Sequence, residues 1–95
     1  MEWRVRALYR TNQFKRDARL AQKTGACALG ELQAVVNLLR TDATLPPHLK
    51  DHSLKGAWKP ARDCHVKPDL VLIYAKFPGE LHLLRLGSHS ELFGR

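Results

Sequence analysis

Hydrophobic and polar residues alternate along the start of the chain. Apolar side chains occupy every second position, and charged residues fill the positions between them as far as residue 6. A period of two is typical of a β-strand with one buried face. We therefore predict a strand over residues 2–9 whose inward side consists of Trp3, Val5, Ala7 and Tyr9.

Apolar residues recur at helical spacing in the next two segments. Thr11 or Asn12 can cap a first helix, and Gly25 supplies the stop signal after it. The apolar face of this helix consists of Phe14, Ala18 and Ala21. A second helix is predicted over residues 28–40, with apolar positions at Leu29, Leu32, Val35, Val36 and Leu39. We expect the two helices to form a hairpin that ends before Pro46.

The second half of the chain reads as a loop followed by strands. Residues 46–57 show no periodicity, so we expect a loop, and it contains His52. Strand-like runs follow over residues 58–66, 70–77 and 81–86, joined by turns at Lys67-Pro68 and Pro78-Gly79. The predicted fold is therefore α+β, in the order β-α-α-β-β-β, with a small antiparallel sheet packed against the helical hairpin.

Length and charge narrow the class of protein. The 95 residues suffice for one domain, over residues 1–95, with one modest core. Sixteen Lys and Arg residues against nine Asp and Glu residues give a net charge of +7, which favours a polyanionic partner such as nucleic acid. Cys27 and Cys64 form no CxxC pair, and no apolar run approaches the roughly 20 residues of a membrane span. We therefore expect a reduced, cytoplasmic protein without membrane contact.

The predicted meander brings candidate catalytic residues together. In an antiparallel meander, the end of the first strand, the start of the second and the end of the third lie at one edge of the sheet. These positions hold His65, Asp69 and His89, and a regular last strand would direct Arg85 to the same face. The position of His52 does not follow from the meander. Histidine acts as base or acid near neutral pH, and cleavage of RNA through the ribose 2′-hydroxyl needs one of each, so the chain is a candidate ribonuclease.

Short motifs across nearly the whole chain occur in the order and at the spacing of one known family. They are Leu20-Ala21-Gln22-Lys23, Leu45-Pro46, Lys50-Asp51-His52, Leu54, Gly56, Trp58-Lys59, Arg62-Asp63, His65-Val66, Pro68-Asp69, Leu72-Ile73-Tyr74, Gly87, His89 and Leu92-Phe93-Gly94. In these motifs the chain resembles the YafQ branch of the RelE/ParE toxins of bacterial type II toxin–antitoxin systems. The resemblance implies a RelE-like fold and a ribosome-dependent mRNA endonuclease that works without metal or other cofactor. It also implies a DinJ- or RelB-like antitoxin as partner, in a toxin–antitoxin heterotetramer, and the 70S ribosome as the site of action.

The resemblance also implies roles for single residues. The family's catalytic positions correspond to His52, His65, Asp69, Arg85 and His89. We expect His89 to be the general acid, His65 with Asp69 to form the base side, and Arg85 to bind the phosphate. The expected products are a 2′,3′-cyclic phosphate, or its 3′-phosphate, and a free 5′-hydroxyl. Substrate contacts are expected from Phe93 as a base-stacking surface, and from Arg62 and Trp58.

Two further features bear on RNA recognition. A basic stripe is expected to contact ribosomal RNA, and it consists of Arg10, Lys15, Arg16, Arg19 and Lys23. The chain departs from the family pattern at Leu70, where a relative has Trp, and at Pro60-Ala61, where it has Gly-Tyr. These departures affect the expected base preference but not the proton chemistry.

Other readings lead to different functions. ParE-like relatives poison DNA gyrase but generally lack this histidine set, and a catalytically inactive antitoxin- or nucleic-acid-binding module of the same fold is a further alternative. A zinc site is disfavoured because Cys64 and His65 are adjacent on a strand and face opposite ways. We interpret Asp63 as a structural residue that pairs at the surface with Arg62 or Lys59, and His82 and His48 as residues outside the site.

Overall fold

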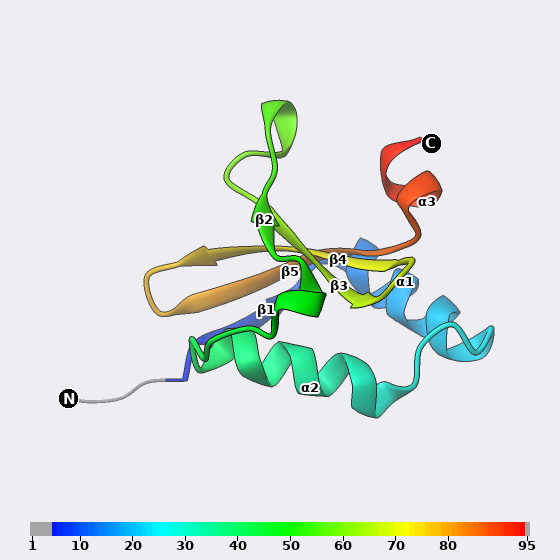
Figure 1. Ribbon diagram of the computed structural model, residues 1–95, viewed down its shortest axis with the longest axis horizontal. Coiled ribbons are helices and arrows are strands. Elements are labelled where there is room, and N and C mark those ends of the chain that lie inside the picture. The colour runs from blue at the N-terminus through cyan, green and yellow to red at the C-terminus, as the bar shows by residue number, and fades with distance from the viewer. Residues whose placement is uncertain (1–4, 95) are drawn as a thin grey trace.

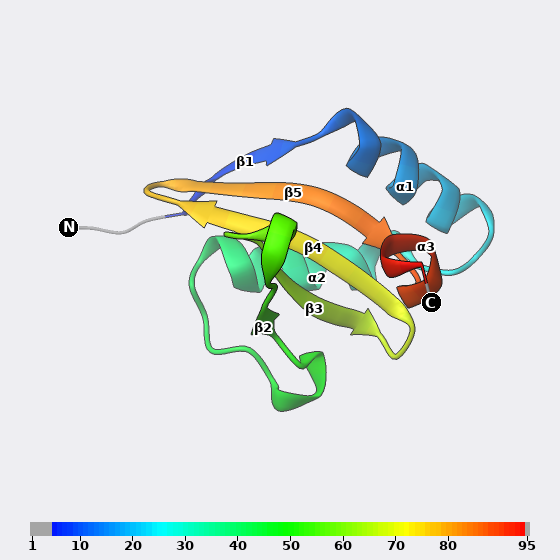
Figure 2. The same ribbon diagram turned by 90° about the horizontal axis from the view of Figure 1, so that it is seen from above.

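The protein folds as a five-stranded mixed sheet with helices on both faces. The computed structural model describes residues 5–94, and the strand order in the sheet is β1-β5-β4-β3-β2 (Figures 1 and 2). Along the chain the elements are β1 (Ala7–Arg10), α1 (Asn12–Lys23), α2 (Leu29–Arg40), the 3₁₀ turn η1 (Pro47–Leu49), β2 (His52–Ser53), the 3₁₀ turn η2 (Gly56–Trp58), β3 (Arg62–Lys67), β4 (Leu70–Phe77), β5 (Glu80–Gly87) and α3 (His89–Phe93).

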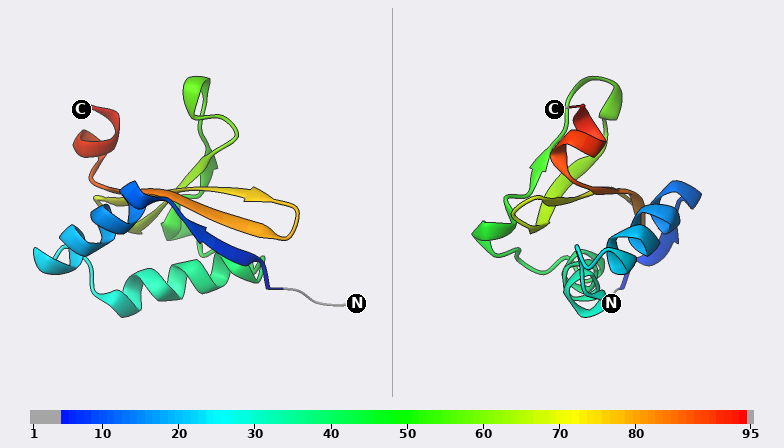
Figure 3. Two further views of the ribbon diagram at one scale, coloured as in Figure 1. Left: turned by 180° about the vertical axis from the view of Figure 1, so that it is seen from behind. Right: turned by 90° about the vertical axis from the view of Figure 1, so that its right-hand side faces the viewer.

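The helices and the connection from β2 to β3 divide between the two faces of the sheet. Helices α1 and α2 cover one face, whereas α3 and the β2–β3 connection rise from the other (Figures 1 and 3). No helix among residues 5–94 is both long and apolar enough to cross a membrane. The α+β class and the order of the main elements agree with the sequence prediction.

Helix α1 begins and ends at the residues that its sequence indicates. The Thr11 hydroxyl accepts a hydrogen bond from the Phe14 amide at 2.9 Å, which satisfies one of the free amides of the first turn. After the helix, Gly25 takes a φ of +78°, a conformation that glycine adopts without strain. The predicted start and stop of this helix are therefore confirmed.

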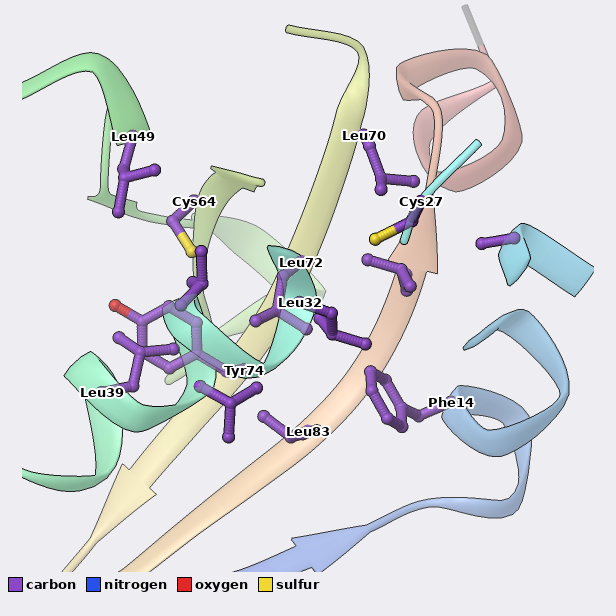
Figure 4. Packing of buried hydrophobic residues seen from close by; sticks show 14 of the residues in the cluster. Phe14, Cys27, Leu32, Leu39, Leu49, Cys64, Leu70, Leu72, Tyr74 and Leu83 are labelled. Carbon is purple, nitrogen blue, oxygen red and sulfur yellow. The ribbon is translucent and has the colours of Figure 1, made fainter. Parts of the chain in front are cut away.

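The main core lies between the two long helices and the sheet. Phe14, Leu32 and Leu39 from the helices meet Leu72, Tyr74 and Leu83 from β4 and β5 (Figure 4). Burial of these apolar side chains supplies most of the driving force for folding. One predicted member of the helix face is different, because Leu29 is 59% exposed at the start of α2.

The inward side of β1 is opposite to the prediction. Leu8 packs against the core, whereas Ala7 and Tyr9 are exposed, and Trp3 lies outside the described residues. The strand is also shorter, and it pairs in parallel with β5 at the edge of the sheet. The alternation of apolar residues therefore misidentified the buried side of this strand, because Leu8 lies outside the predicted set and packs against the core.

The segment between α2 and β3 is more structured than predicted. It contains η1, η2 and the short strand β2, which pairs antiparallel with β3, so the sheet gains a fifth strand. Trp58 belongs to η2, and the strand that was predicted to start there starts at Arg62. Because β1 pairs in parallel with β5, the sheet is mixed rather than purely antiparallel, although β3, β4 and β5 form the predicted antiparallel meander.

A smaller apolar cluster on the second face anchors the elements that carry the candidate site. Ala61, Val71, Ile73 and Leu92 are buried there, and Leu54, Trp58, Leu84 and Phe93 pack against them. Leu84 lies at a register shift in the β4–β5 pair and packs on this face, and the shift returns Leu86 to the main-core face that Leu83 also occupies. Leu92 thereby ties the short helix α3 to the sheet.

Candidate active site

Three histidines converge on the second face of the sheet. His65 on β3 pairs with Val71 of β4, and Val71 pairs with Gly87 of β5, two residues before His89. The ring centroids of His65 and His89 are 5.1 Å apart. His52 lies on the neighbouring strand β2 and joins the same site. The predicted meeting of the strand ends is confirmed, and the structure adds His52, which the meander argument could not place.

Asp69 is bonded to His89. One carboxylate oxygen of Asp69 accepts hydrogen bonds from the His89 backbone amide at 3.2 Å and from its ring Nδ1 at 3.0 Å. The side-chain and backbone hydrogen bonds from His89 hold the pKa of Asp69 below its usual range. Asp69 was expected to act with His65, and this geometry instead pairs it with His89.

The ring of His52 is oriented by its own loop. Its Nδ1 lies 2.9 Å from the Lys50 carbonyl oxygen and 3.0 Å from Asp63 Oδ1. A carbonyl oxygen can only accept, so Nδ1 carries the hydrogen and, in the neutral ring, Nε2 carries the free lone pair. The His52 side chain is 59% exposed. The arrangement therefore presents a proton acceptor to an incoming ligand.

Asp63 is not at the surface, contrary to the prediction. The residue is only 2% exposed, and it lies opposite His52 in the register of β2 and β3. Neither Arg62 nor Lys59 is its partner. Sequence reasoning missed the burial of Asp63. The charged residues next to it suggested ion pairs at the surface, and Leu54, which lies beside it in the structure, belongs to a segment without periodicity.

An open hollow connects these residues. It has a volume of about 270 Å³ and is lined by His52, Leu54, Asp63, His89 and Phe93. Phe93 contacts His89 at a ring separation of 6.2 Å and meets Trp58 edge to face at 5.9 Å. The hollow thus combines imidazoles with an aromatic wall of a kind that can hold an unstacked base.

Arg62 faces away from this hollow. It pairs in register with Tyr74 of the main core, and its guanidinium donates to Asp51 at 2.8 Å. Tyr74 also donates its hydroxyl hydrogen to Asp51. Burial alone would raise the pKa of Asp51, but hydrogen bonds from Arg62 and Tyr74 hold it below the usual range. The expected substrate contact by Arg62 is not supported by this geometry, because Arg62 secures the loop next to His52.

Arg85 is bonded to α1. Its Nε donates to Asp17 at 2.8 Å, and the Leu86 amide donates to the same carboxylate oxygen at 3.0 Å. Arg85 lies opposite Ile73, on the face of the smaller cluster, and its guanidinium reaches Asp17 of α1. Arg85 therefore lies on the face of the sheet where it was predicted, but its guanidinium is paired with the carboxylate of Asp17.

The remaining candidates divide clearly. The residues of the basic stripe are all exposed: Arg10, Lys15, Arg16, Arg19 and Lys23.

Cys27 and Cys64 are free and buried, and burial raises the pKa of Cys64 to about 12. Cys64 lies in the main core, away from His65, and residues 5–94 contain no group of three or more ligating side chains arranged for a metal ion. His82 packs between Tyr9 and Phe77, at ring separations of 4.9 Å to each.

Comparison with known proteins gives one consistent family. The family of bacterial toxins of type II toxin–antitoxin systems, YafQ, matches residues 6–94. The mRNA interferase toxin YafQ of Escherichia coli K12 is 40% identical over 85 residues, which are 88% of this chain and 91% of that protein.

Solved structures agree with this match. The toxin chain in the E. coli DinJ–YafQ toxin–antitoxin complex has 39% identity and a TM-score of 0.84, over 94% of this chain and 98% of that one. A metal-bound toxin from Helicobacter pylori has 44% identity and a TM-score of 0.86, over 92% of this chain and 98% of that one.

Proposed function

The chain belongs to the YafQ family of type II toxin–antitoxin toxins and is an mRNA interferase, and on this premise we propose that its histidine cluster performs the cleavage. The observation that carries the proposal is the meeting of three histidines from separate elements: His52 and His89 line one open hollow, and the ring of His65 lies 5.1 Å from that of His89. The substrate is mRNA on the ribosome. The reaction is attack of a ribose 2′-hydroxyl on the adjacent phosphate.

His52 and His65 form the base side of this reaction. The Nδ1–H of His52 is engaged by Lys50, so its Nε2 can take the proton from the 2′-hydroxyl. The 2′-oxygen then bonds to phosphorus. His65 lies beside His89 and can share the role of general base. The nucleophile belongs to the RNA itself, so the scheme requires no metal-activated water.

His89 acts as the general acid. Asp69 accepts from its Nδ1, which leaves Nε2 to deliver a proton to the 5′-oxygen as the phosphorus–oxygen bond breaks. The products are a 2′,3′-cyclic phosphate and a 5′-hydroxyl. The two protons balance, because the base side gains one and His89 loses one.

Two further groups position the RNA. Phe93, supported edge to face by Trp58, stacks on a base next to the scissile phosphate. Arg85 stabilises the charge that develops on the phosphate, which requires its guanidinium to turn from Asp17 toward the hollow. The basic stripe, at the end of β1 and along α1, contacts ribosomal RNA through its exposed charges.

The partner of the chain is a cognate antitoxin. The DinJ–YafQ complex of E. coli supports this assignment, and we propose a DinJ- or RelB-like protein in a heterotetramer that silences the toxin. Since the substrate is translated mRNA, the proposed place of action is the cytoplasm.

Controlled expression followed by mapping of new mRNA 5′ ends tests the function. Wild-type protein should arrest growth and produce ends at defined positions in the reading frame, and His89→Ala should abolish both effects while still binding antitoxin. Growth arrest with an intact message pool would point instead to another target, such as DNA gyrase. Absence of arrest by the wild type would indicate an inactive module.

A further inference from the structure

Asp63 is a buried charged residue to which the scheme above gives no task. Within residues 5–94 it is the only charged residue that is almost completely buried, at 2% exposure. An unpaired carboxylate in such a place is costly, because the charge loses its hydration. A compensating role is therefore needed to explain the residue.

The carboxylate is aimed at the histidines. Its Oδ1 lies 3.0 Å from His52 Nδ1, yet it has no hydrogen-bond partner, because the Nδ1–H is directed at the Lys50 carbonyl. Asp63 also lines the hollow that His52 shares with His89. The contact between carboxylate and imidazole is therefore electrostatic, and it strengthens when the ring gains a proton.

Most of the titratable groups around Asp63 are histidines, which carry a positive charge when they are protonated. Burial raises its pKa, while His52 on β2, His65 on β3 and His89 on α3 all act to lower it. The neighbouring carboxylate of Asp51 opposes them, and the adjacent thiol of Cys64 is itself held protonated in part by Asp63. Three imidazoles from three elements thus share one buried counter-charge.

We propose that Asp63 is a positioning residue of the cleavage reaction, the common buried counter-charge of His52, His65 and His89. It holds the His52 ring with Nδ1 inward and Nε2 toward the RNA, and it stabilises the imidazolium that forms when His52 takes the 2′-hydroxyl proton. Asp63 itself gains no proton, and no bond to it forms or breaks. This inference rests on the proposed nuclease function.

Titration of the imidazoles by NMR in the free toxin tests the electrostatic part without any need for cleavage. Asp63→Asn removes the charge, so the titration midpoints of His52, His65 and His89 should move to lower pH, and the midpoint of His52, the nearest ring, should move most. His48 and His82 should not move, and they serve as controls in the same spectrum. Asp42→Asn, in an exposed pair with Arg6 and Lys76, is the matched control variant.

Single-turnover cleavage of ribosome-bound message tests the catalytic part. Asp63→Asn should slow cleavage about 10- to 100-fold, less than the full contribution of an acid–base group. Its pH–rate profile should move to lower pH, because imidazoles without the counter-charge lose their protons earlier. In a His52→Gln background the same substitution should have a much smaller effect on the rate, and Asp63→Glu should recover part of the activity.

The outcomes separate cleanly. Unchanged midpoints at His52, His65 and His89 would overturn the inference, whatever happens to cleavage. Loss of cleavage without a displaced pH profile would reduce Asp63 to a structural residue. If Asp63→Asn does not fold, the carboxyl ¹³C resonance of Asp63 in the wild type must show an inflection where the histidines titrate, and its absence contradicts the inference. A wild type that titrates as expected but leaves message intact would instead refute the nuclease function.

Discussion

Phe93 tests the account at the scale of a single side chain. If its ring stacks on a base, Phe93→Ala should slow cleavage about tenfold or more, since a base–aromatic contact contributes about 1–3 kcal/mol. Phe93→Tyr keeps the ring and should retain most of the activity. Single-turnover rates on programmed ribosomes measure both. Equal losses for the two variants would indicate that the residue only packs against Trp58.

The carboxylate of Asp17 should make the stability of the fold depend on pH. It accepts from Arg85 and the Leu86 amide, and these bonds outweigh burial and hold its pKa below the ordinary 3.8. A carboxylate with a lowered folded-state pKa stabilises the fold above the unfolded value, and this stabilisation is lost as the pH falls through the folded value. Acid unfolding of the wild type should therefore include a component below about pH 4 that Asp17→Asn lacks.

Denaturant unfolding can measure the effect of Asp17→Asn on the free energy of unfolding. At neutral pH, Asp17→Asn should lower the free energy of unfolding by about 1–3 kcal/mol, the range for hydrogen bonds to a charged group. Asp42→Asn, whose side chain is 49% exposed, should cost less than about 1 kcal/mol. Equal costs for both variants would contradict the role of the Asp17 contacts.

Residue-scale prediction from the sequence brought His65 and His89 together, left His52 unplaced and failed for Asp63. The positions of His65, Asp69 and His89 follow from the pairing of antiparallel strands, which the pattern of apolar runs revealed. The buried Asp63 lies instead beside Leu54, His89 and Phe93, which come from segments without a readable period. A charged residue between Arg62 and Cys64 gives no local sign of such a cover.

Helix α3 tests the account at the scale of an element. Ser88 caps it, because its hydroxyl accepts from the Glu91 amide while the Glu91 carboxylate accepts from the Ser88 amide. Ser88→Ala should cost about 1 kcal/mol of stability and lower cleavage, since His89 is the first residue of the helix. Circular dichroism melts and cleavage rates report the two effects. Unchanged cleavage would show that the cap does not position His89.

Gly87 provides a steric version of the same test. A methyl group there would lie 3.0 Å from Glu91 Oε1 and 3.4 Å from Leu92 Cδ2, so α3 or its side chains must move. Gly30 is a suitable control, because a methyl group there meets nothing within 4 Å. Gly87→Ala should therefore reduce cleavage more than Gly30→Ala does.

The elements show where sequence periodicity has its limits. The helices were predicted because each repeats its apolar residues over several turns, and β4 was predicted because its apolar residues form a nearly continuous run. The short elements β2, η2 and α3 have too few residues for a period, and their places depend on contacts with the rest of the fold. The register shift in β5 also altered the alternation, so that Leu83, Leu84 and Leu86 serve two different clusters.

At the scale of the whole molecule, the net charge of +7 should govern binding to the ribosome. Each neutralised phosphate adds to the salt dependence of affinity, so reversing Lys15 and Arg19 to glutamate should weaken binding to 70S ribosomes and flatten the dependence on salt. Sedimentation at several salt concentrations measures this. Both residues are exposed, so the fold should remain intact. Unchanged affinity would place the ribosome contact on another surface.

In the proposed mechanism, the histidine cluster cleaves RNA by transferring protons between the 2′- and 5′-oxygens. The most direct measurement is the chemical nature of the new ends when purified protein acts on ribosomes that carry a defined message. The account predicts a 2′,3′-cyclic phosphate, or its 3′-phosphate, and a 5′-hydroxyl with the wild type, and no cleavage with His89→Gln. A 5′-phosphate at the cut, or undiminished cleavage by His89→Gln, would contradict it.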